Sequence, residues 1–187
     1  MNITKNLTWL EFLSLFILLR ILYIAVKNGF LCEILKVIAV GVASFFAFHF
    51  YPMLLRNVQI DFFRIKKECA DVISFLGIFF FAYVLFYFIR RIIHMLIKKE
   101  EVSQAERWLS IPVAVARGII VVSLIGFLVS LGAFCDNGAC KGSIVVQNIG
   151  RITPQLYLGT VRALQARMPK MRINKEVGEY YEVKKNI

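Results

Sequence analysis

Hydrophobic residues run in four long blocks along the chain. A membrane-spanning helix needs about 20 predominantly apolar residues. We therefore expect spans at Leu7–Val26, Ile34–Leu55, Val72–Ile89 and Ile111–Phe134. The third helix has room to continue to Ile97. Arg20 interrupts the first block and no A-x-A site follows it, which favours an uncleaved span over a signal peptide.

The segments between and after these blocks carry signals for helix ends and for one more helix. Ser103 and Glu106 have the spacing of a capping box, so a short helix should begin there. Pro112 should then mark the bend into the fourth span. One helical face after the spans collects Tyr157, Val161, Leu164 and Met168, with Gln155 and Arg162 opposite. This predicts an amphipathic helix that lies either on the membrane surface or against the chain's own spans.

The pattern thus predicts an all-α polytopic membrane protein with four transmembrane helices and a C-terminal amphipathic helix. Residues 1–134 form the expected membrane domain, and residues 135–187 form a tail. The 187 residues are 59% hydrophobic and 19% charged, with a mean hydropathy of +0.69. A typical soluble domain is about 45–50% apolar and about 25% charged, so neither a soluble domain nor a disordered chain fits.

The charges predict an orientation. The formal net charge is +11, but the basic residues flank hydrophobic blocks, which indicates contact with lipid headgroups and not with nucleic acid. Eight basic residues lie near the first and third loops, against six near the N-terminus, the second loop and the start of the tail. The positive-inside rule therefore places those two loops in the cytoplasm, with the N-terminus and the tail outside.

A pair of cysteines provides an independent test of that orientation. Cys135 and Cys140 bracket an Asp-Asn-Gly turn directly after the fourth span. A disulfide between them needs an oxidising compartment, which agrees with a tail outside the cytoplasm. The alternative is that they are two unrelated small residues at the end of a span.

Small and aromatic residues indicate how the spans pack. Small residues recur every four positions, a spacing that lets helices approach closely in lipid. They are Ala39, Ala43 and Ala47 on the second span, and Ala114, Gly118, Gly126 and Ser130 on the fourth. The third span has aromatic residues around its whole circumference and should face lipid or a second copy, with ordinary bulk packing as the alternative.

Polar residues in or beside the spans are the candidate functional residues, because an intramembrane charge needs a partner or water. They are Glu11, Arg20, Glu33, Arg107 and Arg117. We expect Arg117 either to pair with Glu33 or Glu106 or to snorkel to the membrane interface. The sequence has no Gly-rich phosphate loop, nucleophile elbow or H-E-x-x-H motif, and its two His residues lack ligand spacing. We therefore predict no enzyme activity, no metal site and no cofactor.

Four short motifs follow one another in the order and spacing of a known family. They are Trp9-Leu10-Glu11-Phe12, Asn28-Gly29-Phe30-Leu31-Cys32-Glu33, Glu106-Arg107-Trp108-Leu109-Ser110 and Ala114-Val115-Ala116-Arg117-Gly118. These resemble the W-I-D-Y-like, R-G-F-x-x-E, D-R-x-L-G and G-x-x-R-G motifs of the colicin V production protein family (CvpA). The matching residues include Gly29, Glu33, Arg107, Arg117 and Gly118. The departures are Asn28, Glu106, Ser110 and Ala114.

The resemblance covers about Trp9–Ser130. It implies a four-span bacterial inner-membrane protein linked to bacteriocin production and envelope homeostasis, with no accepted biochemical activity and a tail helix outside the cytoplasm. Two functions stay open. One is a non-enzymatic scaffold in the lipid bilayer that forms a homo-oligomer or binds an envelope protein. The other is a subunit of an oligomeric channel or transporter, in which Glu11, Arg20 and Arg117 face one polar path.

Overall fold

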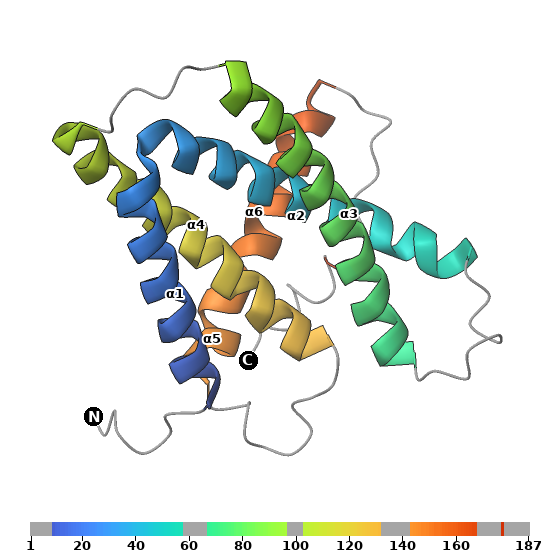
Figure 1. Cartoon of the computed structure of the whole chain (residues 1–187). Coiled ribbons are helices and arrows are strands. Elements are labelled where there is room, and N and C mark those ends of the chain that lie inside the picture. The colour runs from blue at the N-terminus through green and yellow to red at the C-terminus, as the bar shows by residue number, and fades with distance from the viewer. Residues whose placement is uncertain (1–8, 58–66, 97–102, 132–142, 168–176, 178–187) are drawn as a thin grey trace.

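The computed structural model describes residues 9–57, 67–96, 103–131, 143–167 and 177. These residues are almost entirely helical, and none of them forms a strand. The elements are α1 (Trp9–Asn28), α2 (Phe30–Asn57), α3 (Lys67–Leu96), α4 (Gln104–Leu131), α5 (Ile144–Gln147), the 3₁₀ turn η3 (Ile149–Arg151) and α6 (Ile152–Gln165). Figure 1 shows them in chain order from blue to red.

The predicted membrane fold is confirmed. Four helices are long and apolar enough to cross a membrane, over Trp9–Asn28, Phe30–Leu54, Cys69–Ile93 and Gln104–Leu131. The tail adds α6, which is amphipathic as the sequence predicted. The chain therefore has the architecture of a multi-pass membrane protein.

The short helix expected from Ser103 is not a separate element. Gln104–Leu131 is one helix, and Pro112 lies inside it. A proline removes a single backbone donor, and neighbouring groups re-satisfy the freed carbonyl in membrane helices, so the helix continues. Pro52 is accommodated in the same way inside α2.

Helix α4 is the centre of the arrangement. It contacts α1 along one side and α2 along another, and it also contacts α5, η3 and α6 of the tail. Helix α3 packs mainly on α2. In Figure 1, α1 and α3 therefore lie on opposite sides of the molecule, with α2 and α4 between them.

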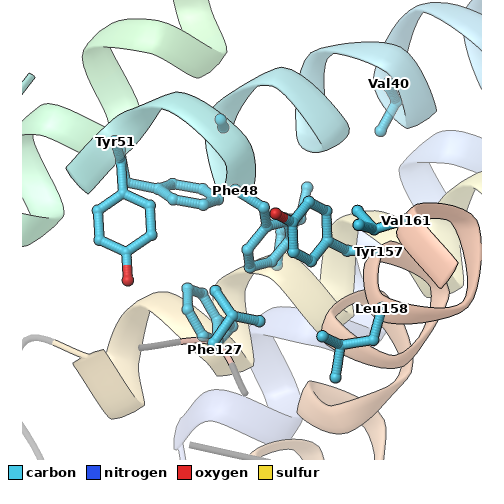
Figure 2. Close-up of a cluster of buried hydrophobic side chains, with 11 residues drawn as sticks. Val40, Phe48, Tyr51, Phe127, Tyr157, Leu158 and Val161 are labelled. Carbon is cyan, nitrogen blue, oxygen red and sulfur yellow. The ribbon is translucent and has the colours of Figure 1, made fainter. Parts of the chain in front are cut away.

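The largest hydrophobic core joins α2, α3 and α4 to the tail helix. The Phe48 ring centroid lies 4.9 Å from that of Phe127, 5.0 Å from that of Phe75 and 5.5 Å from that of Tyr157. Tyr157 comes from α6, and Figure 2 shows its ring beside Phe48, with Leu158 and Val161 on the same helix. The amphipathic helix therefore packs against the chain's own spans, the second of the two alternatives left by its sequence.

The small residues on α2 and α4 are at close helix contacts. Ala39, Ala43 and Ala47 are all buried. A Cβ atom added to Gly118 would lie 2.4 Å from Leu18 Cδ2, so this glycine permits the contact between α4 and α1. Gly126 in turn lies against the backbone of the tail.

The aromatic third span is mostly exposed. Phe75 is buried in the core, whereas Phe80, Phe81 and Phe88 on the same helix are more than half exposed. Since α3 packs on α2 and leaves most of its circumference uncovered, its outer surface is available to lipid or to another protein.

Candidate functional site

A glycine turn positions the central carboxylate of the membrane domain. Gly29 lies between α1 and α2 and has a φ of 76°. Only glycine adopts this left-handed conformation at little cost, which explains its place in the motif. The turn reverses the chain after Asn28, and the Glu33 amide donates to the Gly29 carbonyl at 3.4 Å. Glu33 is thereby fixed in the first turn of α2.

Glu33 is completely buried and forms ion pairs with two basic side chains. Its Oε1 atom is paired with Lys36 Nζ, one turn along the same helix. Its Oε2 atom lies 2.9 Å from Nη1 of Arg117 on α4. The second contact is a charge contact outside the angular range of a directed hydrogen bond. The structure thus joins Arg117 to Glu33, one of the two carboxylates that the sequence offered.

Burying the charges of Glu33, Lys36 and Arg117 costs free energy, which their pairing must offset. A single charge in an apolar environment is costly, and pairing offsets much of that cost. Arg117 is 8% exposed and Lys36 is 9% exposed, so neither cation is solvated along most of its length. The ion pair therefore connects α2 to α4 in a place where water provides little compensation.

Hydroxyl groups make two further links to α4. Ser110 Oγ lies 2.7 Å from the Arg107 carbonyl and 3.2 Å from the Ala25 carbonyl on α1. The serine that departs from the family motif thus occupies a buried position with polar partners. Farther along α4, Ser123 Oγ accepts from the Thr153 amide at 2.9 Å, which fixes the start of α6.

A polar contact joins the tail helix to α2. His49 Nδ1 and the Tyr157 hydroxyl oxygen lie 3.3 Å apart. The Tyr157 ring is buried at the same place. The polar ends of both side chains are therefore partnered where the tail meets the spans.

The other predicted residues are not brought together. Glu11 is half-buried near the start of α1, where its carbonyl accepts from Ser14 Oγ at 2.9 Å, and Arg20 is exposed. Glu106 is half-buried and Arg107 exposed at the start of α4. Cys135 and Cys140 lie outside the described residues. Within the described ranges, no three of His, Cys, Asp or Glu gather closely enough to hold a metal ion.

A cavity of about 580 Å³ lies among the four spanning helices. Its apolar lining includes Ile21, Ile24, Val40, Phe75, Phe79, Val121, Leu124 and Leu128. Lys36, Arg90 and Arg117 also line it, together with Asn28 and Tyr83. The cavity is therefore apolar along most of its length and basic at the end where α1 meets α2.

Two of these basic residues were missing from the candidates chosen by sequence. Lys36 was detectable, since it follows Glu33 by three positions and such residues are neighbours on a helix. Arg90 was not, because only the packing of α3 places it on the cavity wall.

The comparison with known proteins agrees with this arrangement. No curated protein and no solved structure matches the chain. The family model described as Colicin V production protein matches residues 10–154, which is more than half of the chain. The match includes the Gly29 turn, the Glu33–Arg117 pair and the four spans, and it ends at the start of α6. The chain therefore belongs to the colicin V production protein family.

Proposed function

We propose that the protein is a non-enzymatic scaffold of the bacterial inner membrane, of the colicin V production type. The observation that carries this proposal is the pairing of Arg117 with Glu33 at 2.9 Å. The buried charges connect helices to each other, which is what a rigid platform requires. The matching family is not a known enzyme family, which supports a non-catalytic role.

The channel alternative receives less support. It requires Glu11, Arg20 and Arg117 on one continuous polar path. Of these three, only Arg117 lines the cavity between the spans, and its charge is paired with Glu33. Arg20 is exposed on α1.

A scaffold of this kind needs a surface for association, and we assign that role to α3. Phe81, Leu85 and Phe88 are all more than half exposed on this helix. Aromatic side chains bury a large area and favour specific ring geometries, so they suit a contact between two copies.

Disulfide cross-linking tests self-association. In a protein whose native cysteines are replaced by serine, the Leu85→Cys variant should form a disulfide-linked dimer in membranes under mild oxidation. The matched control is Leu19→Cys on α1. The two leucines are 53% and 58% exposed and both lie well inside their spans. Equal dimer yields from both positions would refute association through α3.

We further propose that the N-terminus and the tail lie outside the cytoplasm. Labelling of spheroplasts with a membrane-impermeant maleimide, in a protein whose native cysteines are replaced by serine, checks this orientation. A single cysteine in the Arg162→Cys variant, on the exposed face of α6, should label in spheroplasts. A single cysteine in the Arg107→Cys variant, at the exposed start of α4, should label only after lysis. The reverse pattern would invert the topology.

A further inference from the structure

The cavity between the spans has two chemically different ends. Lys36 and Arg117 line it beside Glu33, and Asn28 lines it at the end of α1. The walls beyond them are apolar, from Val121 to Leu128 on α4. The space is therefore amphipathic, like a lipid molecule.

The basic end carries more positive charge than the described residues neutralise there. Among the described residues, Lys36, Arg90 and Arg117 are the charged side chains on the cavity wall. Glu33 is the carboxylate paired with two of them. Three positive charges against one negative charge leave an excess of two. Such an excess is costly in an apolar environment, so an anion at this end is stabilised.

The apolar part has the length of one lipid leaflet. Arg117 and Leu128 are eleven residues apart on α4, which corresponds to about 16 Å at the helical rise of about 1.5 Å per residue. The hydrocarbon core of a bilayer is about 30 Å thick, so one leaflet contributes about 15 Å. A chain that starts at the basic end would reach the far end of the cavity at Leu128, three positions before the end of the span Gln104–Leu131.

The packing of the helices leaves a route from the bilayer. α1 packs on α4 and α3 packs on α2. Both outer helices line the cavity, α1 with Ile21 and Ile24 and α3 with Phe79 and Phe80. Phe80 lines the cavity and is 58% exposed, which places it at the rim. A lipid entering sideways would pass this residue and need not cross water.

We propose that the cavity binds one anionic phospholipid from the surrounding bilayer. Its phosphate lies beside Lys36, Arg90 and Arg117, and an acyl chain runs along α4 towards Leu128. The excess positive charge at one end selects a lipid with net negative charge over a zwitterionic one. The site goes beyond the scaffold role, because it makes the protein bind anionic phospholipid in preference to zwitterionic phospholipid.

Quenching by brominated lipids tests the proposal. Trp9 and Trp108 are replaced by phenylalanine, and Phe79→Trp places one reporter on the cavity wall. The protein is reconstituted in equal amounts of phosphatidylglycerol and phosphatidylcholine, with bromine on the chains of one lipid or the other. We expect stronger quenching when phosphatidylglycerol carries the bromine. A reporter in the Phe81→Trp variant, which is 75% exposed on α3, should be quenched equally by both lipids.

Two neighbouring arginines give a matched pair of variants. Arg90→Gln removes a cation from the cavity wall and leaves the Glu33 ion pairs intact. It should reduce the preference for phosphatidylglycerol about fivefold, the effect of one basic residue near anionic lipid. Arg91→Gln changes an exposed residue of the same helix and should preserve the preference.

Three results would overturn the proposal. Equal quenching by both lipids at the Phe79→Trp reporter would show a cavity without charge selectivity. Absence of quenching by either lipid would show that no acyl chain enters. Loss of the preference on addition of inorganic phosphate would show that the basic end takes a soluble anion.

Discussion

Replacing Arg117 with alanine should cause the largest loss of stability of any single change to a charged residue on α4. The substitution leaves Glu33 buried and removes the partner that lies 2.9 Å from it. Removing one member of a buried pair typically costs about 3–5 kcal/mol. We expect the lower part of this range, because Lys36 still compensates the charge of Glu33 after Arg117 is removed. We expect a much lower yield of folded protein from membranes and a lower midpoint of thermal unfolding in detergent.

Three further variants separate the ion pair from other roles of Arg117. Arg162→Ala removes an exposed cation from α6 and should have little effect. Arg117→Lys keeps the charge but loses the planar fork, so it should be intermediate. A triple variant, Glu33→Gln with Lys36→Gln and Arg117→Gln, should recover part of the loss, since no charge of the cluster is then left without its partner. Equal unfolding midpoints for the wild type, Arg117→Lys and Arg117→Ala would indicate that the arginine only snorkels to the membrane interface.

Replacing Gly126 with alanine should loosen the tail from the spans. The added Cβ atom would lie 2.8 Å from the Val145 carbonyl oxygen and 3.1 Å from Gly150 Cα. Both are backbone atoms and cannot rotate away, so α4 and the tail must separate. Overpacking of this kind costs about 1–3 kcal/mol. Faster hydrogen exchange in Ile152–Gln165 and a lower unfolding midpoint are the expected observations.

Another glycine of the tail provides the control. Gly159 lies in α6, and a Cβ added there meets no heavy atom within 4 Å. Gly159→Ala should leave the protein equally stable or more stable, because alanine is favoured over glycine within a helix by about 1 kcal/mol. If the two alanine variants unfold at the same temperature, the contact between Gly126 and the tail does not contribute to stability.

The sequence was sufficient to locate the spans and the turn between the first two. A long apolar segment in a bilayer forms a helix, because a helix satisfies its backbone hydrogen bonds internally. Gly29 was identified by its motif, and its φ of 76° explains why a glycine is needed. These features depend on local chain properties, which is why they could be predicted.

The sequence left the partner of Arg117 open between Glu33 and Glu106. Glu106 and Arg117 both lie on the continuous helix α4, eleven positions apart, which is about 16 Å along the axis and beyond reach. Glu33 remains as the partner because the Gly29 turn places it beside α4.

The position of α6 could not be decided from its own sequence. An apolar stripe with Tyr157 and Val161 is equally suited to a lipid surface and to a protein groove. The deciding features lie on other elements, namely His49 on α2 and Ser123 on α4. The recurrence of small residues at Gly126 indicated a close approach but did not identify the tail as the neighbour.

The docking of α6 has a consequence for the order in which the protein is made. During synthesis all four spans leave the ribosome before the helix that packs against Phe48 and Phe127. Until then His49 and Ser123 lack their partners from the tail, in a membrane that offers them few substitutes. The newly inserted chain is therefore an intermediate with unpartnered polar groups in the membrane. Docking of the tail gives these groups their partners and completes the fold. A ribosome that stalls after α4 would leave a product that a membrane quality-control protease can distinguish from the mature protein.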